Sequence, residues 1–589
     1  MNAPVFDFLG IYGLFMPPSP RLIGPSRFVT LCLRHFNPPI IGKWSHSSFM
    51  SGSARILGIT TAFFSGFLCC LLLPCLGATQ SLKSASGTDD LAQSFRVGGK
   101  VIDTKAYLDQ AWEAKGRPGL FANGGMIWEP ATRQWHVKPG LPRDFSKAIA
   151  HYASWTATAA GIGINIARTY HELNLIDELA AFYSAFLKAN FTTLGELRNT
   201  HSSEIKLKLL GPDLGPDTAR TLAWYAEQPD GSVVLRDCYL CNADYFYPTA
   251  TLIRIIAMLK PAERTPAMTQ FVAEYVPLLV NEHLLRPGFA ERMRADMKAG
   301  NPPGSHKNMI NDEIEVVGSS AELLGATAAD SHLVVIAPAE LAQLKDLVKA
   351  GVERFQFSRT ITKDADGRTR ASYFNGDYDW HEDMDFAGYR GEKFPTSADK
   401  AKAKGVSWDI SHFSIVPMFL RSLFDNKAAT GVDFPQKADI EYIGNQYAFQ
   451  VFEGDYKKLL FRNFFDGTDG WYRVSYLGRS SYGIAPSIYC NMFDPSHGCL
   501  TIAGIYSWGF LAPLHPDIAK IQFALLDLAR SSDPSIACFQ PACFRERYYR
   551  YGDASFSFLD SDGKIQYPPA LIVILSQLVV PLDTARGAH

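Results

Sequence analysis

Residues 373–391 have the sequence YFNGDYDWHEDMDFAGYRG, and residues 406–424 have the sequence VSWDISHFSIVPMFLRSLF. The first stretch crowds titratable and aromatic side chains between glycines, which is typical of a loop lining a cleft, because loops on a rigid scaffold often carry chemistry. The second stretch predicts a helix that Ser407 or Asp409 caps. Its apolar residues have the spacing of one buried helical face, at Phe413, Val416, Phe419, Leu420 and Leu423. We expect an active site where the loop meets this helix start, beside Asp409 and His412.

Long helical patterns lie on both sides of this stretch. They cover residues 144–172, 176–198, 244–260, 264–285 (kinked by Pro277), 309–326, 338–355, 408–425, 436–453, 499–511 and 515–530. Strand patterns are few, at 98–102, 470–477 and 556–570, the last as a hairpin around Ser561-Asp562-Gly563. The series predicts a mainly α fold of helical hairpins closed into a ring, an α/α toroid. An irregular helical domain and an open solenoid are the alternatives. Since no linker divides residues 90–580, we expect a single catalytic domain there.

The composition sets broad limits on function. The chain has 589 residues, 47% of them hydrophobic, and a formal net charge of −2, so it can bury a large core and gives no indication of nucleic-acid binding. Aromatic residues make up 13%, which suits either sugar stacking or a large helical core. The sequence has no phosphate-binding glycine loop, nucleophile elbow, zinc-protease motif or dinucleotide fingerprint, which disfavours those enzyme classes.

The N-terminal region predicts export. Residues 56–76 are apolar and uncharged, follow Arg55, and lead into small residues that end at Ala78. We interpret residues 50–78 as a signal peptide or an N-terminal membrane anchor, with Met50 as the start, and residues 1–49 as a non-structural upstream segment. Six cysteines follow Ala78 as three local pairs, at 238/241, 490/499 and 538/543. These pairs fit disulfide bonds in an oxidising compartment, so we expect a secreted or periplasmic protein, with or without a membrane anchor.

The 373–391 loop suits two kinds of glycan chemistry. In β-elimination on a uronic acid, a Tyr or His takes the proton next to the carboxylate, while Asn or Arg stabilises the resulting charge. The loop supplies such groups at Tyr373, Asn375, His381, Tyr389 and Arg390, with Trp380 as a substrate-binding residue. Glycoside hydrolysis would instead use two carboxylates, among Glu382, Asp383, Asp385 and Asp409. The acidic pattern also allows a divalent cation, although it lacks the spacing of a calcium loop, and a polar surface loop is the simplest alternative.

Three further clusters extend the predicted site. Trp408, Asp409 and His412 could bind substrate and transfer a proton, or Asp409 could merely cap the helix while His412 bonds to a backbone carbonyl. A second cluster, Asn308, Asn311 and Glu313, could hold a substrate carboxylate or cap the next helix. Finally, Trp471 and Arg473 could line a groove for an acidic sugar chain, or belong to the core and the solvated surface. The sequence assigns no residue set to a metal, because the CxxC at 238–241 lacks a second half-site for zinc.

Taken together, the signal, the helical series, the Tyr/His/Asn/Arg-rich loop and the Trp-Asp-Ile-Ser-His helix start resemble the secreted bacterial polysaccharide lyases built on α/α toroids, which degrade alginate and glucuronan. The resemblance covers most of residues 90–530 as a pattern. It implies β-elimination on a uronic-acid polysaccharide without a protein-bound cofactor. Tyr389 or Tyr373 would act as base and acid, assisted by His412 or His381. Arg390 with Asn308 or Asn375 would neutralise the substrate carboxylate. An inverting glycoside hydrolase on the same ring and a non-catalytic glycan-binding envelope protein are the alternatives.

Overall fold

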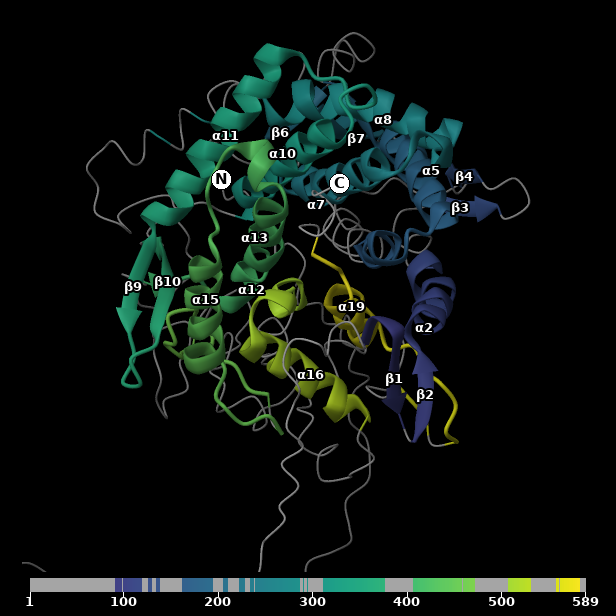
Figure 1. The fold of residues 1–589 in the computed structure, drawn as a ribbon. Coiled ribbons are helices and arrows are strands. Elements are labelled where there is room, and N and C mark those ends of the chain that lie inside the picture. The colour runs from purple at the N-terminus through teal and green to yellow at the C-terminus, as the bar shows by residue number, and fades with distance from the viewer. Residues whose placement is uncertain are drawn as a thin grey trace, which may run out of the picture. The chain divides into compact units, whose positions relative to one another are not determined.

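The computed structural model describes residues 91–97, 99–118, 126–129, 134–137, 161–193, 205–209, 222–227, 233–237, 239–285, 290, 294, 311–376, 406–457, 459–471, 507–530, 558–560 and 562–582. All of them belong to the unit that includes Lys83–His589. Residues 1–78, Cys238 and the proposed pairs 490/499 and 538/543 lie outside this part of the chain, whereas Cys241 lies in the helix Tyr239–Met258, where only its backbone is described. The start of the helix expected at 144–172 also lies outside, and the rest is described as helix 161–170. The described residues are mainly helical with a few short strands, as the sequence predicts (Figure 1).

Long helices form the first half of this structure. They are α5 (Leu173–Asn190), α7 (Tyr239–Met258), α8 (Pro266–Leu278), α10 (Asn311–Ala329) and α11 (Pro338–Phe357). Helix α10 packs on α7 and α11, and α5 packs on α8. Each was predicted with boundaries shifted by a few residues, except that α5 ends earlier than expected, because residues 191–193 form a strand. Pro277 lies in the last turn of α8, where the chain continues as the π-helix η3 (Leu279–Leu284).

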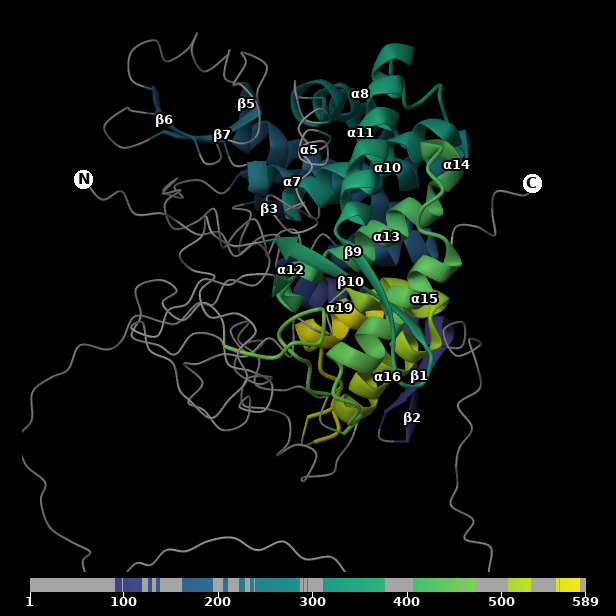
Figure 2. The same cartoon turned by 90° about the vertical axis from the view of Figure 1, so that its left-hand side faces the viewer.

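The helix predicted at 408–425 is two helices, α12 (Ile410–Phe413) and α13 (Val416–Asp425). The break has a local cause. Pro417 has no N–H to donate to the preceding turn, and its ring disfavours helical backbone just before it, so Pro417 suits only the first turn of a new helix. The predicted apolar face of this segment is buried, as expected. Helix α13 lies against α10 and the later helix η10, and Figures 1 and 2 both show α13 beside α10.

The remaining helices pack around α13. They are α14 (Lys427–Thr430), α15 (Lys437–Gln446), the π-helix η6 (Tyr447–Val451), the 3-10 helix η10 (Trp508–Leu514), α16 (Pro516–Arg530) and α19 (Pro569–Leu578). The helices predicted at 436–453 and 515–530 are confirmed, whereas η10 begins near the end of the range predicted as 499–511. The hairpin predicted within residues 556–570 is confirmed, because Leu559 pairs with Ile565 and Gly563 has the positive φ of 73° that its turn needs. The predicted range is too long, since α19 begins at Pro569.

Strands contribute several small sheets, most of which the sequence did not predict. A hairpin joins β1 (Ser94–Val97) to β2 (Lys100–Asp103), followed by α2 (Thr104–Ala111) and the π-helix η1 (Trp112–Gly116). A second pair is β3 (Met126–Glu129) with β4 (Gln134–Val137). A mixed sheet has the order β5-β7-β8-β6, from Phe191–Thr193, Leu222–Glu227, Val233–Asp237 and Ile205–Leu209. The last sheet has the order β11-β10-β9, from Val406–Ser407, Thr369–Gly376 and Arg359–Lys363.

Strand β10 corrects one expectation about the 373–391 loop. Tyr373 and Asn375 lie in this strand rather than in a loop, and Phe374 pairs with Ser407 of β11. The strand is the second arm of a hairpin with β9, whose turn uses Gly367 at φ 79°. This pairing anchors the first residues of the stretch directly beside the start of α12.

An apolar core of large side chains joins these elements. Near α12 it becomes a stack of aromatic rings, with Phe413 3.8 Å from Phe465 and Tyr447 3.8 Å from Trp508, centroid to centroid. Within the ranges described above, no helix combines the length and apolarity needed to cross a bilayer.

Candidate functional site

The strongest local constellation pairs Asp409 with His412 at the start of α12. Asp409 Oδ1 accepts a hydrogen bond from the backbone N–H of His412 at 3.1 Å, and its Oδ2 lies 2.6 Å from His412 Nδ1. One carboxylate therefore caps the helix, as one interpretation expected, and also fixes the orientation of the imidazole. Its side chain is 1% exposed, whereas that of His412 is 15% exposed. A buried carboxylate that holds a partly accessible imidazole is an arrangement that can orient a base.

The backbone around this pair is held from both sides. The Ile410 N–H donates to the Asn463 carbonyl oxygen at 2.9 Å, and Asp409 forms an isolated antiparallel bridge with Phe464. On the other side, the Ser407 hydroxyl donates to the Tyr373 carbonyl oxygen at 2.8 Å. The end of β10 and the start of α12 are thus neighbours, as the sequence predicted.

The side chain of Tyr373, by contrast, belongs to the core. It is 0% exposed and stacks on Phe355 with the ring centroids 4.3 Å apart. Burial raises the pKa of its hydroxyl well above the ordinary value, and nearby Arg359 offsets only part of that rise. A phenol that is fully buried cannot readily exchange a proton with a substrate, which argues against Tyr373 as the catalytic base and for a structural role.

The predicted stacking residues that the structure describes are also internal. Trp408 and Trp471 are buried, whereas sugar stacking needs an accessible ring face, so both favour a structural role. Glu313 is partly exposed in the first turn of α10. For Asn311 and Asn375 the structure describes the backbone, in α10 and β10, but not the side chain. The remaining candidates lie outside the described residues: Asn308, Trp380, His381, Tyr389, Arg390 and Arg473.

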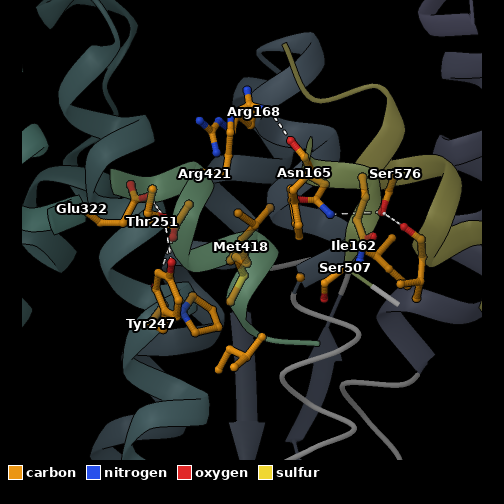
Figure 3. A pocket seen from close by; sticks show the side chains of 18 of the residues that line it. Ile162, Asn165, Arg168, Tyr247, Thr251, Glu322, Met418, Arg421, Ser507 and Ser576 are labelled. Atoms are coloured by element: carbon orange, nitrogen blue, oxygen red, sulfur yellow. Dashed lines mark hydrogen bonds between the residues drawn. The ribbon is translucent and has the colours of Figure 1, made fainter. Parts of the chain in front are cut away.

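A cavity that the sequence did not predict lies among the helices (Figure 3). Helix 161–170, α7, α10, α13, η10 and α19 all contribute to its wall, together with Ser414 and Ile415 between α12 and α13. Its volume is about 110 Å³ on a scale where one water needs about 10–15 Å³. Glu315, from the start of α10, and Ser414, two residues after His412, both line this cavity.

A buried ionic cluster forms one side of this cavity. Asp425 Oδ2 accepts from Arg421 Nε at 2.8 Å and from Arg168 Nη2, an arginine on helix 161–170. Arg421 also donates to the Phe510 carbonyl oxygen at 3.0 Å and to the Pro581 carbonyl oxygen. One arginine on α13 therefore ties together η10 and the residues after α19.

A second buried network connects α7, α10 and α13. The Tyr247 hydroxyl donates to Ser422 Oγ at 2.7 Å, and the Ser422 hydroxyl donates to Glu322. Arg254 then lies 3.1 Å from Glu322, Nη1 to Oε2. Burial raises the pKa of the Tyr247 hydroxyl well above its usual range, and the negative charge of Glu322 adds to the rise. Tyr247 is therefore a hydrogen-bond donor here, not a base.

Tyr247 also depends on a glycine of α10. A Cβ on Gly318 would lie 2.6 Å from the Tyr247 hydroxyl oxygen, so only glycine lets α7 and α10 approach this closely. The small residues in mid-helix at Gly318-Ser319-Ser320 are the one sequence signal that could have indicated close packing with buried polar groups.

Among the described residues, no group of three His, Cys, Asp or Glu side chains could hold a metal ion. No protein-family model, curated protein or solved structure matches this chain.

Proposed function

We propose that the protein is an exported polysaccharide lyase that cleaves a uronic-acid-containing glycan by β-elimination. The observation that carries this proposal is the Asp409–His412 pair, with its 2.6 Å contact between a buried carboxylate and a partly exposed imidazole. The apolar run at 56–76 supports export, and the packing of α10 between α7 and α11 is compatible with an α/α toroid built from helical hairpins.

The pair suits proton abstraction. With Nδ1–H directed at Asp409, the lone pair of the imidazole resides on Nε2, which would take the proton next to the uronate carboxylate. The developing negative charge of the enolate needs a cation or an amide, for which Arg390 with Asn308 or Asn375 are the proposed groups. Tyr389 would return a proton to the leaving glycosidic oxygen. Tyr373 is left out of the proposed catalytic set because it is buried.

The test is an ultraviolet assay for the unsaturated uronate end that β-elimination creates, on alginate, glucuronan, pectate and glycosaminoglycans. Replacing His412 by Gln removes the base and should lower the rate by about 10²–10⁴-fold. His332→Gln, at an exposed histidine in the turn after α10, is the matched control and should retain full activity.

New reducing ends without ultraviolet absorbance would contradict the lyase and favour an inverting glycoside hydrolase. Binding of an oligosaccharide without any turnover, unchanged by His412→Gln, would instead favour a glycan-binding protein.

A further inference from the structure

The cavity between helix 161–170, α7, α10, α13, η10 and α19 has a chemical character of its own. It is mostly surrounded by buried residues, and Figure 3 shows polar side chains from several helices around it, among them Asn165, Thr251, Ser507 and Ser576. These four groups come from helix 161–170, α7, the residue before η10 and α19, whereas Ser414 brings the wall to within two residues of His412. The chemistry of the lining indicates what the cavity could bind besides the substrate of the proposed β-elimination.

The charged side chains that the structure describes around the cavity are equal in number and opposite in sign. Its wall contains Arg168, Arg421, Glu315 and Glu322. Behind these, Asp425 bonds to both wall arginines and Arg254 bonds to Glu322. Among the described residues, this gives three guanidinium groups and three carboxylates. Since a charged ligand would add an uncompensated charge to a buried and balanced cluster, the cavity favours a neutral ligand.

The uncharged polar groups are hydroxyls and amides. The Ser576 hydroxyl accepts from Asn165 Nδ2 at 3.2 Å and donates to the Val573 carbonyl oxygen at 2.8 Å, and the Thr251 hydroxyl donates to the Tyr247 carbonyl oxygen at 3.1 Å. Since these protons are used within the protein, the hydroxyl oxygens can still accept from a ligand whose own groups are donors, such as hydroxyls. Gln577 also lines the cavity, and its buried Oε1 accepts no hydrogen bond from the described residues. A ligand with hydrogen-bond donors would match these acceptor oxygens.

Apolar groups and size complete the description. Met418, Phe510 and Ile162 lie among the polar lining residues, which gives the mixed surface that recognises a ring with C–H faces and hydroxyl edges. The volume of about 110 Å³ is several times the roughly 10–15 Å³ that one water needs on this scale, so the cavity has room for a small ring-sized molecule. We propose that this cavity binds a neutral, hydroxyl-rich molecule of the size of a single sugar ring.

The experiment is a titration of the full chain with D-glucose, D-galactose and D-mannose, each beside its uronate counterpart, followed by calorimetry or ligand-observed nuclear magnetic resonance. At least one neutral sugar should bind saturably and more tightly than its uronate. Met418→Trp should fill the cavity and weaken that binding by about tenfold or more, whereas the volume-conserving Met418→Leu should retain it. Thr251→Leu fills the cavity from α7 and should also weaken binding, with Thr251→Ser, which keeps the hydroxyl, as its control.

The proposal is overturned if no neutral sugar binds, if the uronate binds more tightly than its neutral partner, or if the filled variants fold and bind like the wild type. The two filling sites lie on different helices, so misfolding of one variant leaves the other as a test, and circular dichroism checks the fold of each. The outcome is separate from the lyase assay, because a protein without β-elimination activity would still bind the neutral sugar.

Discussion

Replacing Asp425 by Asn should destabilise the protein far more than the same change at a surface pair. Asp425 is 0% exposed and is shared by Arg421, four residues earlier and 1% exposed, and by Arg168, 10% exposed. Asn keeps the shape and an acceptor oxygen but removes the negative charge. At 2.8 Å and an effective dielectric constant of about 20, the Arg421–Asp425 attraction alone is about 6 kcal/mol before desolvation is counted.

The net effect is smaller than this gross attraction, because the buried charges already cost free energy to desolvate. Removing one partner of a buried pair usually costs about 3–5 kcal/mol, since the remaining charge stays buried. We expect a loss of that size for Asp425→Asn, measured as the free energy of unfolding in urea by circular dichroism and tryptophan fluorescence. The size of this loss should change little with salt concentration, because salt screens buried ion pairs only weakly.

Asp109→Asn is the matched control. Asp109 also pairs with a cation four residues away in the chain, Lys105 at 2.8 Å, but its side chain is 43% exposed. Exposed pairs of this spacing contribute only about 0.3–0.5 kcal/mol. The reasoning is refuted if Asp425→Asn costs less than about 1 kcal/mol, or no more than Asp109→Asn, because the buried cluster would then not hold α13 to helix 161–170.

Three further predictions concern packing, pH and catalysis. Gly318→Ala should cost about 1–3 kcal/mol of unfolding free energy in urea, because the new Cβ would overlap Tyr247, which a hydrogen bond holds in place. Gly161→Ala is the control and should be neutral or stabilising, because a Cβ at this position would have no atom within 4 Å. Burial lowers the pKa of His515 below 6.5, so the unfolded chain binds the proton at a higher pH than the folded protein does. The contribution of His515 to stability should therefore be constant above about pH 6.5 and should decrease below it until the pH passes the folded-state pKa. His515→Asn should remove this contribution from the pH dependence of urea unfolding. If the proposed base is correct, Asp409→Asn should lower the rate of β-elimination by less than His412→Gln does, and rates on the best substrate decide this.

The long helices could be predicted because their evidence is local. Helix α11 was expected at 338–355 and runs from Pro338 to Phe357, since proline at the first turn and a regular apolar spacing mark it in the sequence. The Asp409–His412 pair could be predicted for the same reason, because its partners are three residues apart and one carboxylate can reach both groups.

The strands could not be predicted with equal success. The parallel pairing of β6 with β8 and the antiparallel pairing of β7 with β8 decide whether these segments are strands, and strand preference depends on such context more than helix preference does. Tyr373 shows the consequence. Its neighbours suggested a polar loop, but pairing with β9 and stacking on Phe355 place it in the core.

The cavity lay beyond local reasoning for a different reason. Arg421 and Asp425, four residues apart on an amphipathic helix, have the spacing of an ordinary surface ion pair, yet both are buried. Their burial depends on η10 and on Pro581, which are far away in the sequence. Charge patterns identify which residues can pair but not which pairs the fold covers.

The most direct test of the proposed function is the mass of the oligosaccharides released from each polyuronate. β-Elimination should give products one water lighter than hydrolysis products, with ultraviolet absorbance that grows in step with them and is lost in His412→Gln. Products with the mass of hydrolysed oligosaccharides, or full activity in His412→Gln, would contradict the account.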